Sequence, residues 1–270
     1  MSLIVSRAAR IRQPPGFVRI APAWQSRVVA CILPSSRLDV VNGGLALSGT
    51  APGITVTDYG IANQANGSGL LYSLFPAGAV PSVVGTTLLT AGYRNTSATA
   101  FHAAAGENAS SGGFFAVESN GTANIYYRVR TVAGSGISDF DSSDVTVRGT
   151  ANCVTAFRLT GLSSATCSIN GVDAGGRLVG SGATGVPAWS RFSVCGLMRD
   201  TASYATSGSS RYALAALLVG LTQADERTLS NNPWQIFAPQ ERRIWVAVPS
   251  GAVFNAAWAR GSNSIIGHAP

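Results

Sequence analysis

The stretch that decides the fold runs from Arg211 to Pro239 and reads RYALAALLVG, then LTQADERTLS, then NNPWQIFAP. Its first part, Tyr212–Val219, is apolar at both alternating sets of positions, which predicts a strand buried on both faces. Thr222 lies three residues before Asp225, and this capping-box spacing predicts the start of a short helix. Pro233 disfavours helical geometry in the residue before it, so the helix is expected to end there.

This closing stretch resembles the end of a laminin-G-like, concanavalin A-like jelly-roll domain in bacteriophage virion proteins. In that family a last strand runs into L-(T/S)-x-x-E-x-x-x-L-(S/A)-x-N-P-W-Q-(I/L)-F and then into a basic tail with tryptophan. The matching residues are Leu221, Thr222, Glu226 (one place later than usual), Leu229, Ser230, Asn232, Pro233, Trp234, Gln235, Ile236 and Phe237, and the tail is Arg242, Arg243, Ile244, Trp245 and Val246. The segment Arg12–Ile20 and the Asn170-Gly171 hairpin are similar to other parts of these proteins. The resemblance implies a jelly-roll sandwich in a virion and carries no catalytic residues.

Short strand signals, separated by turn signals about every ten residues, run through the middle of the chain and predict an all-β antiparallel sandwich. Asn42-Gly43-Gly44, Asn120-Gly121 and Asn170-Gly171 each predict a hairpin turn. Alternation predicts which residues face inward, namely Ile125, Tyr127, Val129, Phe157, Leu159, Ala165, Cys167 and Ile169, and which face outward, namely Tyr126, Arg128 and Arg130.

We therefore expect one sandwich at residues 23–238, between an N-terminal arm at 1–22 and a C-terminal tail at 239–270. Pro14, Pro15 and Pro22 exclude a regular helix from the arm. Large apolar residues in the arm and the tail are unfavourable in water, so we expect them to pack on the sandwich or on a partner. The residues predicted to dock partners are Phe17, Trp234, Phe237, Trp245 and Trp258.

The composition argues against several classes of function. Charged residues make up only 11% of the chain, and all 19 basic residues are arginines that are scattered apart from Arg242–Arg243. A nucleic-acid interface needs a clustered basic face, so we expect no nucleic-acid partner. The four cysteines form no CxxC pair, which argues against a zinc site and favours free thiols. We find no signal peptide and no apolar window long enough to span a membrane, so we expect synthesis in the host bacterial cytoplasm.

Candidate sites for chemistry are few. The glutamates do not occur in the Glu-x-Asp-x-(x)-Glu pattern of glycosidases on this fold, and His102, in an Ala-rich segment expected to be a loop, has no nucleophile-elbow serine beside it. Asp139, Asp141 and Asp144 fit either a calcium loop or a solvated turn. Aromatic residues that could stack on sugar rings, if they are exposed, are Tyr59, Tyr93, Tyr126, Trp189 and Tyr204.

The sequence therefore predicts a non-enzymatic structural protein of a tailed bacteriophage particle, either head-decorating or tail-associated. It requires no cofactor, and its partners would be other virion proteins and copies of itself. The alternative is a carbohydrate-binding or host-recognition module of the phage tail that binds a host surface glycan. This alternative comes from the use of the fold in glycan binding.

Overall fold

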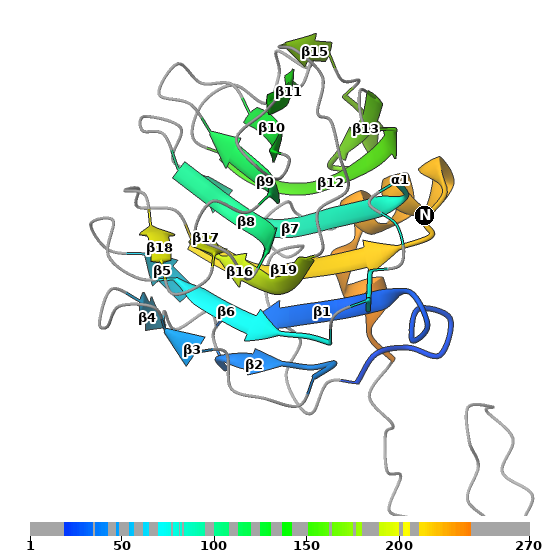
Figure 1. The fold of residues 1–270 in the computed structure, drawn as a ribbon. Coiled ribbons are helices and arrows are strands. Elements are labelled where there is room, and N and C mark those ends of the chain that lie inside the picture. The colour runs from blue at the N-terminus through cyan, green and yellow to red at the C-terminus, as the bar shows by residue number, and fades with distance from the viewer. Residues whose placement is uncertain are drawn as a thin grey trace, which may run out of the picture.

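The computed structural model shows two antiparallel sheets packed face to face, and among the residues that it describes one α-helix lies beside them (Figure 1). It describes residues 19–34, 36–42, 47–48, 54–56, 62–64, 70–76, 78–80, 82, 84–94, 100–107, 113–119, 125–130, 137–141, 151–161, 164–174, 177–179, 189–199, 202–205 and 211–238. The all-β antiparallel sandwich predicted from the sequence is confirmed.

The first sheet has nine strands within the described residues. Its main path runs β14 (Val172–Asp173), β13 (Ser164–Ile169), β12 (Ala151–Gly161), β7 (Thr86–Arg94), β19 (Arg211–Val219), β1 (Val28–Leu33) and β2 (Leu38–Asp39). Off this path, β5 (Ala62–Gln64) pairs with β19 and with β4 (Ile54–Val56). The last long strand of the described residues, β19, thus lies between β1 and β7 in the middle of the sheet.

The second sheet has eight strands in the same described part of the chain. Their order is β15 (Arg177–Val179), β11 (Ile137–Asp141), β10 (Ile125–Arg130), β9 (Phe114–Ser119), β8 (Ala100–Glu107), β16 (Trp189–Val194), β6 (Leu71–Leu74) and β3 (Leu47–Ser48). A separate hairpin of β17 (Gly196–Arg199) and β18 (Ala202–Ala205) follows β16. Here β9, β10 and β11 form a continuous meander.

The core between the sheets is built from the alternate residues that sequence periodicity places inside. Phe157 and Leu159 of β12 and Cys167 and Ile169 of β13 are all buried there. The ring of Phe115 lies 5.2 Å from that of Phe157 and 5.6 Å from that of Trp189, measured between centroids. Aromatic rings at these separations contribute beyond their buried area, so this cluster ties the two layers together.

Strand β19 is buried on both faces, as its sequence predicts. Tyr212, Ala215 and Leu217 lie in the inter-sheet core, whereas Leu214, Ala216 and Leu218 lie in a second apolar cluster on the other face of the same sheet. That second cluster is completed from the C-terminal side by Leu221, Leu229, Ile236 and Phe237. The segment after β19, which we call the closing unit (residues 221–238), therefore covers the outer face of the nine-stranded sheet.

Helix α1 (Gln223–Asn231) of the closing unit begins at the predicted capping box. The Asp225 N–H donates to the Thr222 hydroxyl at 3.2 Å, and the Thr222 N–H donates to the Asp225 carboxylate at 2.9 Å. The helix ends before Pro233, which starts the 3₁₀ helix η3 (Pro233–Ile236) at a position where a missing N–H costs nothing. Both boundaries follow from the local sequence.

The two ends of the described chain pair with each other beside the closing unit. Ile20 forms a β-bridge with Phe237, the Ala21 N–H donates to the Ile236 carbonyl at 2.9 Å, and the Ala238 N–H donates to the Arg19 carbonyl at 2.9 Å. Residues 19–22, which the sequence assigns to the arm, thus belong to this closure. Arg19 and Ala238, where the described residues begin and end, therefore lie beside each other.

One of the three predicted hairpins is confirmed and two require correction. In β13–β14, Asn170 and Gly171 have φ of 52° and 84°, as a two-residue turn requires. Strands β9 and β10 pair as expected, but Ser119 is opposite Ile125, so their loop has five residues rather than two. The Asn42 hairpin is wrong because β2 pairs with β1 in one sheet and β3 with β6 in the other. The Asn42 side chain instead donates to the carboxylate of buried Asp39 at 2.7 Å.

Candidate functional surfaces

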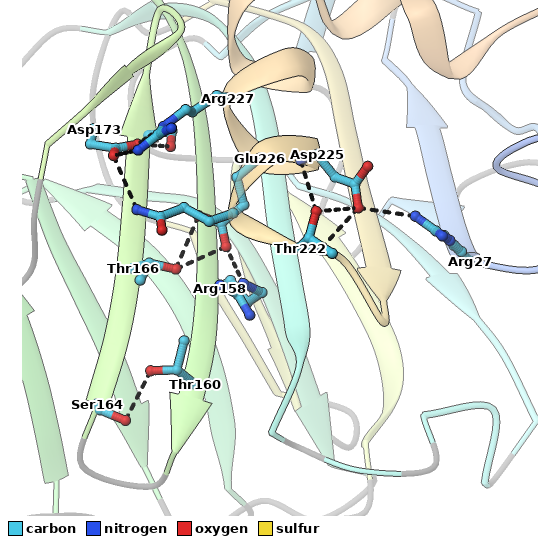
Figure 2. Close-up of polar contacts among 12 residues, drawn as sticks. Arg27, Arg158, Thr160, Ser164, Thr166, Asp173, Thr222, Asp225, Glu226 and Arg227 are labelled. Carbon is cyan, nitrogen blue, oxygen red and sulfur yellow. Dashed lines mark hydrogen bonds and ion pairs between the residues drawn. The ribbon is translucent and has the colours of Figure 1, made fainter.

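The most concentrated charged contacts with described side chains lie under helix α1 (Figure 2). Glu226 points from the helix toward the sheet and is fully buried. It pairs with Arg158 of β12 and accepts bonds from the Thr166 hydroxyl of β13 at 2.8 and 3.0 Å. Burial raises the pKa of Glu226, and Arg158 and Thr166 act in the opposite direction. The Glu226 carboxylate therefore attaches helix α1 to strands β12 and β13.

A second carboxylate joins the same helix to the β13–β14 hairpin. Asp173 pairs with Arg227 and accepts a bond from the Gln223 amide at 3.0 Å. The hydrogen bond from Arg227 is the main reason why the pKa of Asp173 is lowered. Next to it, the Gly171 N–H donates to the Ser230 hydroxyl at 3.0 Å. The hairpin is thus fixed to the helix along its whole turn.

The third carboxylate, Asp225, belongs to the helix cap and pairs with Arg27 at 3.0 Å. Burial disfavours its ionised form, but the donors of Thr222 and the charge of Arg27 outweigh burial and lower the pKa of Asp225. A glycosidase needs two carboxylates that face a substrate. These three carboxylates of the closing unit face their own cations instead, so their geometry fits attachment of a helix.

His102 and the cysteines lie in the core. His102 is in strand β8, not in a loop as the sequence suggested, and its Nδ1 hydrogen-bonds the Tyr212 hydroxyl of β19. Both side chains are buried, so the bond joins the two sheets and His102 cannot reach a substrate. All four cysteines are buried thiols outside disulfides, as predicted. Burial raises the pKa of the Cys31 and Cys195 thiols, which stay protonated and weakly nucleophilic at neutral pH.

The eight-stranded sheet has an outer face that the closing unit does not cover. Val117 of β9 is in the inter-sheet core, so its neighbours Ala116 and Glu118 lie on the opposite, outer face. Part of this face is occupied, because the chain turns at Cys195 (φ 67°) and the Ser193 hydroxyl donates to the Gly196 carbonyl at 2.8 Å. Hairpin β17–β18 then lies against β8. Ala104 of β8 and Phe114 and Ala116 of β9 form a third buried apolar cluster on this face, so the face is covered over these two strands.

Register brings polar residues together on this outer face. Tyr126 of β10 is directly opposite Glu118 of β9 and Asp141 of β11, and Asp141 is in turn opposite Arg177 of β15. We call Glu118, Tyr126, Asp141 and Arg177 the Tyr126 row. Directly paired residues of antiparallel strands share one face, with Cβ atoms about 5 Å apart. The Tyr126 row thus places an aromatic residue between two acids, and an arginine beside one of them.

A second row on the same face lies two residues along each strand. Arg128 of β10 is opposite Ala116 of β9 and Asp139 of β11. The placement of Tyr126 and Arg128 on the outer face agrees with the prediction from alternation.

The aspartates considered for a calcium loop are placed differently from that expectation. Asp139 and Asp141 lie in strand β11 rather than in a turn, because a spacing of two residues fits a strand as well as a loop. The third member of the proposed calcium loop, Asp144, lies outside the described residues.

The predicted partner-docking residues divide into two groups. Trp234 and Phe237 stack with centroids 6.0 Å apart, and both pack in the apolar cluster under the closing unit. Phe17, Trp245 and Trp258 lie outside the described residues. Of the aromatic residues considered for sugar stacking, Trp189 is only 2% exposed and belongs to the core, so it cannot act as a platform. Register places Tyr126 next to Glu118 and Asp141, and Tyr93 next to Asn152 and Arg211. Tyr59 lies outside the described residues.

In the described part of the chain, no three His, Cys, Asp or Glu residues come together in a group that could hold a metal ion. No helix in that part is long and apolar enough to cross a membrane.

No family model matches the sequence, and no curated protein matches it. Solved structures, in contrast, share its fold. They include the binding domain of Paraclostridial Mosquitocidal Protein 1 (TM-score 0.51, 11% identity, 78% of this chain and 53% of that one). A botulinum neurotoxin serotype D ligand binding domain in complex with N-acetylneuraminic acid matches similarly (TM-score 0.52, 8% identity, 79% of this chain and 52% of that one).

A third structure comes from work on cell entry of botulinum neurotoxin type C, described as dependent on interaction with two ganglioside molecules (TM-score 0.53, 10% identity, 77% of this chain and 51% of that one). The chain spans about half the length of these three structures. At such low identity the similarity concerns the fold. This chain therefore has the β-sandwich architecture found in the matched part of toxin binding domains.

Proposed function

We propose that this chain is a non-enzymatic carbohydrate-binding module, with its site on the outer face of the eight-stranded sheet. The observation that carries the proposal is the Tyr126 row. A tyrosine can stack on the apolar face of a sugar ring. Carboxylates and a guanidinium beside it supply acceptors and donors for sugar hydroxyls. Register puts these groups next to each other on one face.

The fold agrees with this proposal. One similar structure is a complex with N-acetylneuraminic acid, and another comes from work that describes toxin cell entry as dependent on interaction with two ganglioside molecules. Fold similarity alone does not transfer a ligand, because one fold hosts many functions. It does make a sugar the first ligand class to test. The carboxylates of the other charged cluster, under helix α1, are paired with arginines of the protein and are therefore not available to a ligand.

The test is glycan-array binding by the purified full chain, followed by calorimetric titration of the best ligand. Tyr126→Ala should weaken binding about tenfold or more, because it removes the aromatic ring on which the sugar is proposed to stack. Tyr126→Phe is the matched control because it keeps the ring, and it should bind within about threefold of the wild type. Thermal melting of both variants checks that they fold.

Two outcomes would overturn the proposal. If no glycan on the array binds above background, the carbohydrate-binding function is refuted. If a ligand binds the wild type, Tyr126→Ala and Arg128→Ala with the same affinity, the site is not on this face. Arg128 is included because it occupies the second row, two residues from Tyr126 on the same strand.

We also propose that the chain is assembled into a tailed bacteriophage particle through its terminal segments. The sequence resemblance to virion proteins motivates this setting, and one structural observation favours it. Arg19 and Ala238, where the described residues begin and end, lie beside each other next to Phe237. The segments that continue from them start at one place, where a single neighbouring protein can bind both.

Deletion tests this second proposal. Removing residues 1–18 or 242–270 should abolish incorporation into particles while the Ile20–Phe237 closure and the sandwich stay intact. Incorporation is measured by detecting the chain in purified particles, and folding by the cooperative thermal transition of the isolated variant. Wild-type incorporation of both deletion variants would contradict the proposal.

A further inference from the structure

We infer that the C-terminal segment Ile244–Val248 docks on the outer side of its own sandwich before the chain is assembled, an inference that goes beyond both proposed functions. The docking surface borders the apolar cluster that the closing unit completes. Four half-buried apolar residues from separate parts of the chain pack against that cluster. We call them the tryptophan rim, and they are Ile20, Trp24, Val40 and Trp234.

The two tryptophans are the largest members of the rim, and each ring is held by a neighbour. Trp234 stacks with Phe237, with ring centroids 6.0 Å apart. The guanidinium of Arg27 lies over Trp24, 5.7 Å from the ring centroid, and Arg27 also pairs with Asp225 at 3.0 Å. The rings are therefore fixed in place although both are only half-buried. Tryptophans that combine a fixed position with partial exposure are typical of binding surfaces.

The C-terminal segment starts at the edge of this rim. The Ala238 N–H donates to the Arg19 carbonyl at 2.9 Å, beside the bridge between Ile20 and Phe237. In residues 239–270, the longest uninterrupted apolar run is IWVAV, at Ile244–Val248. Its first residue is six positions after Ala238, so an extended connection spans about 20 Å. That reach is enough to place the run on the ring that stacks with Phe237.

The position of this run favours its own chain as the binding partner. A segment joined to its site by a short linker has an effective concentration of roughly millimolar, which gives it an advantage over the same segment of another copy. The N-terminal arm begins at the same place, but next to Arg19 it offers only Phe17 and Val18. We therefore assign the rim to Ile244–Val248, while residues 249–270 remain available to a partner in the particle.

The experiment places a photoreactive probe on the full chain. Trp245→p-benzoylphenylalanine puts the probe in the middle of the apolar run, and Trp258→p-benzoylphenylalanine is the matched control outside it. After irradiation, mass spectrometry identifies the crosslinked peptides. The probe at 245 should crosslink to peptides that contain Trp24 or Trp234 about tenfold more than the probe at 258, because only the docked run is held at the rim. Melting temperatures confirm that both variants fold.

A mixture of isotopically light and heavy chains identifies the occupant. Crosslinks to the rim within one chain support the inference. Crosslinks to the rim between light and heavy chains overturn it, because the partner is then a second copy. Crosslinks that avoid the rim, or equal yields from the two probe positions, also overturn it. None of these results bears on glycan-array binding or on incorporation into particles, which are measured separately.

Discussion

Replacing Arg158 with methionine tests how helix α1 is held, because the partner of Arg158 has no contact with solvent. Glu226 is 0% exposed, and its carboxylate pairs with Arg158 and accepts bonds from Thr166. Removing one partner of a buried ion pair costs about 3–5 kcal/mol, because a charge stays buried without compensation. The Arg158 side chain is 17% exposed and Thr166 keeps its bonds. We therefore expect R158M to lose about 3 kcal/mol of the free energy of unfolding.

The assay is urea denaturation of the wild type, R158M, E226M and the double variant R158M/E226M. Replacing a buried ion pair by apolar residues of similar volume is often neutral, so the double variant should lie within about 1 kcal/mol of the wild type. R27M is the matched control. It removes the salt bridge to Asp225, the neighbour of Glu226 on the same helix, but the Arg27 side chain is 39% exposed. Exposed pairs contribute about 0–1 kcal/mol, so R27M should change little.

The pH dependence of the free energy of unfolding tests the same ion pair independently. Burial raises the pKa of Glu226, and R158M removes one of the groups that lower it. A carboxyl group whose pKa is higher in the folded state binds protons more readily there. The free energy of unfolding therefore rises as the pH falls through the folded pKa toward the ordinary value of 4.5. R158M should recover part of its deficit in that window.

Two results would refute this reasoning about Glu226. One is a deficit in R158M below about 1 kcal/mol, the value expected of a solvated pair. The other is a double variant that is no more stable than R158M, because the cost then comes from lost packing of the arginine and not from a stranded charge.

Three further changes test the closing unit. T222A removes the cap hydroxyl and should cost about 1 kcal/mol in urea denaturation, and a loss below about 0.3 kcal/mol would show that the cap contributes little. Gly171 and Gly220 both have positive φ (84° and 66°), but only at Gly171 would a Cβ meet another atom, 2.8 Å away on Asn231. G171A should therefore lower the melting temperature more than G220A, and equal shifts would contradict a close contact. The pKa of Asp173 is lowered, so its stabilisation is present above the ordinary value of 3.8 and lost as the pH falls through its folded pKa. D173N should accordingly reduce stability at pH 7 and have a weaker acid dependence than the wild type, and parallel pH profiles would refute this.

Local signals predicted the closing unit well. Thr222 and Asp225 are three residues apart and Pro233 follows the helix, so the capping box and the helix end depend on neighbours in the chain. The burial of β19 on both faces is equally local, since a continuous apolar run leaves no face for water. Asn170-Gly171 formed its turn for the same reason, because both residues tolerate a positive φ.

What the sequence could not supply was the identity of distant partners. Arg158 and Glu226 are 68 residues apart, and nothing in the pattern around either residue names the other. The Tyr126 row could not be predicted for the same reason. Glu118, Asp141 and Arg177 become neighbours of Tyr126 only through the register of four strands. The misassigned Asn42 turn shows the converse case. Its residues suit a hairpin, but β2 pairs with β1 and β3 pairs with β6, and these partners belong to different sheets.

The two proposed activities use opposite sides of the sandwich. The closing unit and the paired ends at Ile20 and Phe237 lie on the outer side of the nine-stranded sheet, because they pack in the apolar cluster on that face. The Tyr126 row lies on the outer side of the eight-stranded sheet, across the inter-sheet core. Packed sheets are about 10 Å apart, so two full layers of chain separate an attachment made by the terminal segments from a ligand at Tyr126. The proposed attachment and the proposed sugar binding would therefore not compete for surface.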